Sequence, residues 1–347
     1  METLIHQGLL PWHEQVWADV IRASQAGGGL LLFGPTGHGK RFLGRRLAQA
    51  LLCEQPLPGQ HPCGHCQGCL LFNAGQHPDF IEIVPEALVD DFVRLRREDD
   101  ESDDKEKKAS KEIRIKDIRN LARMATLTAH RGGKRVVLIW PADEMNLESA
   151  NAILKTLEEP GQGLCFVLVA SHPAKLIPTV RSRVKSVDCG AASAVQATQW
   201  LASRGVADSA KALGLGVGAP LKALFLFEQP AKDDSVALRE QCLEWLLQAA
   251  LSGVKERPVG LEALGLPQWL QTVLLLGYEV MRVKQGRPPL HLHWIEPQLR
   301  KVRLAGETTL PAYLERCIDF MPVATHPLNL RMQLDDLAVR WTSCFKV

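Results

Sequence analysis

Short apolar runs alternate with amphipathic segments through the first half of the chain. Continuous apolar runs at 30–33 (LLLF), 135–140 (RVVLIW) and 165–170 (CFVLVA) have the length of buried strands, and 80–84 (FIEIV) alternates as a strand does. Between them, apolar residues recur with helical spacing, most clearly over 147–159. Strands that alternate with helices predict an α/β domain with a parallel sheet, whose ligand site lies at the carboxyl ends of its strands.

The pattern changes after residue 188, where no further buried strand is predicted. The remaining apolar positions have helical spacing and form three short segments followed by four longer ones. These segments are 193–204, 209–215, 220–227, 237–250, 268–285, 310–320 and 329–344. We therefore predict three domains: an α/β domain over 1–188, a small helical lid domain over 189–232 and an all-α domain over 233–347. Within the first, the dense mixture of charges at about 90–112 (Asp90 to Lys111) predicts a solvated or disordered loop.

Composition narrows the class of protein. The chain has 347 residues, 46% of them hydrophobic and 23% charged, which is ordinary for globular proteins. Its net charge of +2 gives no argument for tight nucleic-acid binding by the chain alone. The N-terminus does not resemble a signal peptide, no apolar run reaches membrane-spanning length, and the nine cysteines are an odd number. We therefore expect a cytoplasmic protein with reduced thiols.

A glycine-rich segment follows the first predicted strand. It contains three glycines and a lysine in the spacing of a phosphate-binding P-loop: Gly34, Gly37, Gly39 and Lys40. Backbone N–H groups at such a turn attract phosphate, and the lysine adds a point charge. The next position of the pattern requires a Ser or Thr hydroxyl for Mg²⁺, but this chain has Arg41, which cannot bind a cation. We expect a vestigial loop that binds ATP weakly or not at all.

Four of the cysteines form a compact cluster in the sequence. They have the short spacings of a metal site: Cys53, Cys63, Cys66 and Cys69. Four thiolates fill the tetrahedral shell of Zn²⁺ and leave no open position for water. The cluster therefore predicts one structural zinc in a module over 53–73, without a catalytic role for the metal.

Three further stretches resemble one family. His77–Pro78–Asp79 after the cysteine cluster, the run NAILKTLEEP at 151–160, and Arg181–Ser182–Arg183 resemble bacterial clamp-loader subunits of the AAA+ class. The resemblance implies a RecA-like AAA+ domain with a zinc module, then a helical lid domain and an all-α collar domain. It also implies a hetero-pentamer with gamma/tau and delta subunits, which loads the sliding clamp on primer-template DNA for DNA polymerase III.

The resemblance distinguishes two kinds of subunit by their nucleotide site. In the gamma/tau motors an acidic pair ends the second strand of the site, and here those positions hold Trp140 and Pro141. Leu221 stands where the lid arginine is expected, with Lys222 beside it, and Arg41 replaces the metal-binding hydroxyl. Phosphoryl transfer depends on positioning and on charge neutralisation by Mg²⁺ and arginine. The three losses favour the non-catalytic stator, the delta-prime branch, over the motors.

One arginine is expected to act outside its own chain. Ser182–Arg183–Val184 resembles the family's Ser-Arg-Cys motif, with Val184 in place of the cysteine. The resemblance implies that Arg183 reaches the ATP of a neighbouring subunit as an arginine finger. The alternative is an ordinary surface arginine, since Arg181 and Lys185 are close by in the sequence.

Two other functions remain open at this point. The first is a working ATPase of the gamma/tau type, which the segment 34–40 favours and in which Asp143 and Glu144 would weakly replace the missing acidic pair. The second is a zinc-dependent nucleic-acid-binding module. The second is disfavoured because no face rich in aromatic and basic residues accompanies the cysteines.

Overall fold

The computed structural model describes residues 8–25, 29–88, 110, 112–115, 118, 133–228, 235–254, 256–321 and 330–346. The chain divides into two compact units, Met1–Ser193 and Ala194–Val347. The charged segment predicted at about 90–112 lies outside the described residues, apart from Ser110 and Glu112. The further division of the second unit into lid and collar domains stays a prediction.

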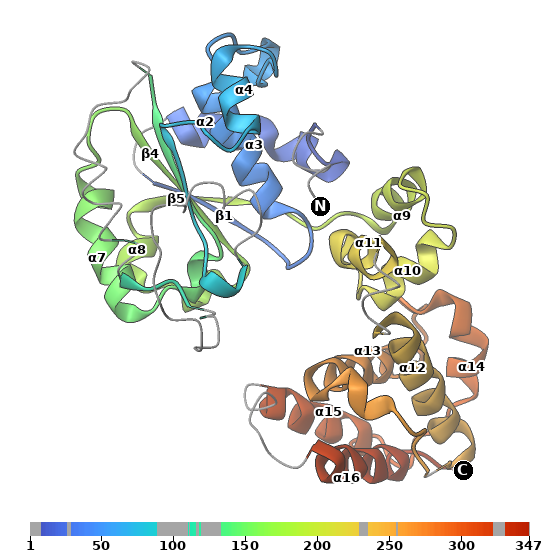
Figure 1. Ribbon diagram of the computed structural model, residues 1–347. Helices are drawn as coiled ribbons and strands as arrows, with labels where there is room; N and C mark the ends of the chain where they lie inside the picture. Colours follow the sequence, from blue (N-terminus) through green and yellow to red (C-terminus); the bar gives the residue numbers. More distant parts are fainter. Residues whose placement is uncertain are drawn as a thin grey trace. The chain divides into compact units, whose positions relative to one another are not determined.

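The first unit is built on a parallel sheet of five strands in the order β2-β3-β4-β1-β5 (Figure 1). The strands are β1 (Gly29–Phe33), β2 (Phe80–Ile83), β3 (Arg135–Ile139), β4 (Leu164–Ala170) and β5 (Val184–Asp188). Leu31 of β1, which lies between β4 and the edge strand β5, is in register with Leu168 of β4 and Ser186 of β5. The four predicted strands are confirmed. The fifth was missed because β5 is a largely exposed edge strand with the polar sequence VKSVD, so it has no apolar run.

Helices cover both faces of this sheet, so it has a core on each side. In the described part of the first unit they are α2 (Glu14–Gln25), α3 (Lys40–Leu52), α4 (Gln67–Asn73), α7 (Leu147–Glu158) and α8 (Pro178–Arg181). Leu30 and Leu32 of β1 pack with α2 and α3, whereas Leu31 points to the opposite face and packs with α7 and α8. At Gly44 of α3, a Cβ atom would lie 2.8 Å from Leu138 of β3, so the helix needs a glycine to lie this close to the sheet.

The second unit is helical. Its helices are α9 (Ala194–Ser203), α10 (Ser209–Leu215), α11 (Pro220–Glu228), α12 (Ser235–Ser252), α13 (Leu266–Lys284), α14 (Glu296–Lys301), α15 (Thr309–Phe320) and α16 (Leu330–Ser343). Trp269 of α13 and Trp341 of α16 are fully buried in its core, and the Trp341 indole N–H donates to Leu246 O at 2.8 Å. The seven helices predicted after residue 188 are all present, and α14 is additional.

Short 3-10 helices connect these elements. They are η1 (Pro11–His13), η2 (Pro58–Gln60), η3 (Glu86–Leu88), η4 (Ala142–Glu144), η5 (Pro173–Lys175), η6 (Leu261–Leu264) and η7 (His293–Ile295). In the described residues, no helix is by itself long and apolar enough to cross a membrane. Helices α10 and α11 meet that criterion only when taken together, as a pair bent by 107°.

Candidate functional site

The predicted phosphate loop has the backbone that its glycines allow. It runs from the end of β1 to the start of α3. Three of its residues have positive φ angles: Gly34 (149°), Gly37 (78°) and Gly39 (87°). Residues with a Cβ atom adopt such angles rarely, so the glycines are required by the shape of the turn. Whether this turn holds a phosphate stays a prediction.

Lys40 begins α3 and is almost completely buried. Its ammonium Nζ donates hydrogen bonds to Pro35 O at 2.7 Å and to Ser171 Oγ at 3.2 Å. Ser171 follows β4, so this cation lies at the carboxyl ends of two neighbouring strands, where ligands bind in parallel sheets. Burial lowers the pKa of Lys40, while Cys189 and Asp143 act in the opposite direction. The lysine that would meet a phosphate is held by its own loop and by the segment after β4.

Arg41 is fixed by two contacts at the position of the missing metal ligand. Its Nε donates to Glu82 Oε1 at 2.9 Å, and its guanidinium carbon lies 4.4 Å from the centre of the Trp140 ring. Cation–π contacts of this length are attractive. Arg45 shares the same carboxylate, with Nη2 donating to Glu82 Oε2 at 2.7 Å. Two of the positions that depart from the motor pattern, Arg41 and Trp140, thus contact each other.

Glu82 is the residue that sequence reasoning missed. Its side chain is fully buried on β2, and it accepts hydrogen bonds from both Arg41 and Arg45. The sequence did contain a signal for it, a single carboxylate within an otherwise apolar strand, because such a carboxylate needs a cation as partner when it is buried. Which cation it meets cannot be seen in the sequence.

The two acidic residues near the strand end have other partners. Asp143 Oδ2 accepts hydrogen bonds from the backbone N–H groups of Ser171 at 3.2 Å and His172 at 2.8 Å. Glu144 Oε1 lies 3.5 Å from Lys175 Nζ. Asp143 therefore secures the segment after β4, and neither carboxylate stands at the end of β3 in place of Trp140.

The four clustered cysteines come together in space. Their Sγ atoms all lie within 4.8 Å of one another, with Cys53 and Cys66 at 3.8 Å and Cys63 and Cys69 at 4.0 Å. Zn–S bonds of about 2.3 Å in a tetrahedron place sulfur atoms about 3.8 Å apart, so the cluster fits zinc. Backbone N–H groups of Cys63, Cys66 and Cys69 point at Sγ atoms of the cluster at 3.3–3.4 Å, as expected around thiolates.

The backbone also favours thiolate at one of these cysteines. Burial acts to raise the pKa of Cys63, but hydrogen bonds from the backbone of His65 and Cys66 lower this pKa to about 6. Gly64 has a φ of 83°, which gives the turn between the ligands its shape. The predicted set of four residues therefore forms one donor group at the junction of α3 and α4.

Arg183 lies in the turn between α8 and β5. Its Nε donates to Glu158 Oε1 at 2.7 Å, and Nη1 donates to Thr179 O at 2.9 Å. One third of its side chain is exposed, so the guanidinium is both oriented by its own chain and accessible at the surface of the first unit. Lys222, which neighbours the lid position Leu221, donates instead to Gln271 Oε1 of α13 at 3.1 Å.

The fold and the site together define a class. A parallel sheet in the order β2-β3-β4-β1-β5, with a glycine loop after β1 and a buried lysine at the start of α3, is an α/β domain of the RecA-like P-loop class. Comparison with known proteins adds the family. A family model described as DNA polymerase III, delta subunit, matches residues 12–192. The DNA polymerase III subunit delta' of Pseudomonas aeruginosa is 33% identical over 244 residues, covering 69% of this chain and 68% of the relative.

A second relative agrees. The delta' subunit of Escherichia coli K12 is 30% identical over 292 residues, covering 82% of this chain and 73% of the relative. Among solved structures, that of a gamma subunit-related protein of Thermotoga maritima aligns with 96% of this chain and 99% of its own chain, at 16% identity and a TM-score of 0.43. The chain belongs to the delta-prime family of DNA polymerase III subunits. The family resemblance that the sequence indicates is confirmed.

Proposed function

We propose that this chain is the delta-prime subunit of a clamp loader, that it does not hydrolyse ATP itself, and that it completes the ATPase site of a neighbouring subunit. Membership of the delta-prime family supports the clamp-loader role. The partners would be gamma/tau and delta subunits in a hetero-pentamer, which loads the sliding clamp on primer-template DNA for DNA polymerase III. Similarity to the tau subunit of Escherichia coli, 30% over 185 residues, is consistent with related subunits in one assembly.

The contact between Arg41 and Trp140 carries the non-catalytic part of the proposal. An ATPase of this class needs a hydroxyl and a carboxylate for Mg²⁺ and for orienting water. Here a cation and an indole ring fill those positions and stabilise each other, and Glu82 holds the cation in place. A metal ion would have to displace this arrangement and would meet a positive charge.

ATP turnover by the purified chain tests this part, with Lys40→Ala as the control. We expect no phosphate release above that of Lys40→Ala, since the site lacks ligands for the metal. Turnover that Lys40→Ala abolishes would instead assign the chain to the gamma/tau type of ATPase motor.

Arg183 would act in trans. Its guanidinium is exposed on the first unit, and contacts with Glu158 and Thr179 fix its direction, which reduces the entropy lost when it meets a phosphate. An arginine finger stabilises the charge of the transition state and accelerates hydrolysis by roughly 10³–10⁵-fold.

A reconstituted clamp loader tests this role. Arg183→Ala should slow ATP turnover at the neighbouring site while the complex still assembles, and the matched control Arg181→Ala should leave turnover unchanged. Equal turnover in the Arg183→Ala complex and the parent complex would exclude the finger.

The four cysteines would hold one structural zinc ion. When bound, zinc would cross-link the end of α3 to the start of α4, in a part of the chain where two ligands are only partly buried. A closed shell of four thiolates supplies no position for a substrate, so the proposed role of the metal is stability alone.

A further inference from the structure

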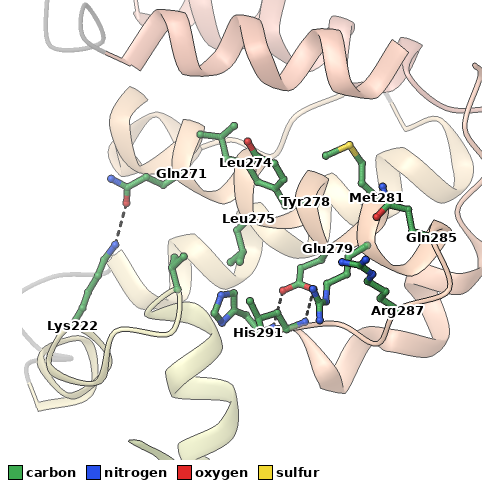
Figure 2. Close-up of a pocket in the computed structure, with 13 residues that line it drawn as sticks. Lys222, Gln271, Leu274, Leu275, Tyr278, Glu279, Met281, Gln285, Arg287 and His291 are labelled. Carbon is green, nitrogen blue, oxygen red and sulfur yellow. Dashed lines mark hydrogen bonds between the residues drawn. The ribbon is translucent and has the colours of Figure 1, made fainter. Parts of the chain in front are cut away.

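The second unit contains a pocket of about 660 Å³ that the proposed function does not use (Figure 2). One wall is α13, with Leu274, Leu275 and Tyr278, and another is the segment after α13, with Leu290. Lys222 of α11 closes one end. Pockets of roughly 300–1,000 Å³ are typical of binding sites.

The edge of this pocket exposes apolar side chains. Tyr278 is 50% exposed, Leu290 is 53% exposed and Val217 is 39% exposed. Val217 also has a φ of 56°, which is strained for a β-branched residue. Apolar side chains gathered around an open concave surface mark a place where another molecule binds. The open edge leaves room for an occupant that extends beyond the pocket, as a segment of a larger molecule would.

The charges of the pocket indicate the chemistry of that partner. Among the described residues, three cations line it, Lys222, Arg282 and Arg287, against the single carboxylate of Glu279. That carboxylate is buried and accepts the backbone N–H groups of Leu290 at 2.8 Å and His291 at 2.7 Å, so its charge is compensated within the chain.

Two of the cations stand at opposite ends of the pocket. Figure 2 shows Lys222 at one end and Arg287 at the other, with Leu275 and Glu279 between them. The acceptor for Lys222 is a neutral amide, that of Gln271. Burial, and secondarily Arg239, lower the pKa of Lys222 to about 8. An occupant with an acidic group near each end would place a negative charge beside each of these two cations.

We propose that this pocket docks an acidic–apolar peptide segment of a partner protein, in which leucine, isoleucine or phenylalanine side chains are flanked by aspartate or glutamate. The apolar side chains would lie on Leu274 and Leu275, and the acidic ones would pair with Lys222 and Arg287. Single-stranded nucleic acid fits less well, since it binds on several large aromatic side chains and, in the described part of the chain, Tyr278 is the one Phe, Tyr or Trp side chain lining this pocket. This proposal does not depend on the nucleotide site.

Peptide selection on the full-length chain tests the proposal. A displayed library of random dodecapeptides is selected on the parent protein and, in parallel, on Arg287→Glu. We expect peptides enriched only on the parent, containing both large apolar and acidic residues. A labelled copy of the best peptide should bind Arg287→Glu or Lys222→Glu about tenfold more weakly by fluorescence anisotropy.

The matched control is Lys301→Glu, which reverses an exposed cation of the same unit outside the pocket and should leave peptide affinity unchanged. Thermal unfolding of each variant verifies that it is folded. The proposal is overturned if no peptide is enriched over Arg287→Glu, or if the enriched peptides lack acidic residues. Displacement of the peptide by oligothymidine would assign the pocket to nucleic acid and would equally overturn it.

Discussion

Glu82→Gln should destabilise the first unit strongly, although the substitution hardly changes the shape of the side chain. The Glu82 side chain is fully buried and compensates two cations, Arg45 with 3% of its side chain exposed and Arg41 with 11%. Glutamine removes the negative charge and leaves both guanidinium groups in a site that excludes water. The expected loss comes from these uncompensated charges.

The magnitude follows from the geometry. Removing one partner of a buried ion pair costs about 3–5 kcal/mol. The glutamine carbonyl oxygen can still accept a hydrogen bond, so we expect the lower end, about 3 kcal/mol. Arg41→Gln should cost less, about 1–2 kcal/mol, because Glu82 keeps the Arg45 contacts at 2.7–3.0 Å.

Hydrogen exchange followed by mass spectrometry measures the destabilisation that each variant causes within the first unit. The free energy of opening is compared for peptides that cover β2 and β3, with the exposed Glu159→Gln as the control for loss of one carboxylate. A value for Glu82→Gln within about 1 kcal/mol of the control would refute the reasoning. A larger loss in the free energy of opening for Arg41→Gln than for Glu82→Gln would refute it as well.

Three further outcomes are expected. The purified protein should contain one zinc ion per chain, and Cys66→Ser should lower both the zinc content and the melting temperature. A parent protein that contains no metal and melts at the same temperature as the variant would contradict the zinc centre. Arg41→Thr should not restore ATP turnover, because Trp140 still stands in place of the carboxylate, and phosphate release from this variant would contradict that account. Gly44→Val should destabilise the first unit by about 1–3 kcal/mol in thermal unfolding, since its Cβ would lie 2.8 Å from a leucine of β3, whereas Gly133→Ala, with open space around the new methyl, should have little effect.

The sequence by itself determined the parts of this protein that local patterns encode. The buried strands β1, β3 and β4 are short apolar runs, and the helices after residue 188 follow from their spacing. The glycine loop and the four cysteines are each close together in the chain, so spacing alone predicted a glycine turn with positive φ angles and a cluster of four thiols, and the structure has both. The family was visible for the same reason, in continuous runs such as 151–160.

Only the tertiary structure decided which distant residues meet. Arg41, Glu82 and Trp140 belong to segments that follow or form three different strands, and their contact depends on strand order and on the path of α3 across the sheet. The pairing of Arg183 with Glu158 and the pocket beside α13 arise in the same way. A buried charge needs a partner of opposite charge. Which charges become buried, and which partners they meet, depends on long-range packing, and the local periodicity of the sequence does not specify that packing.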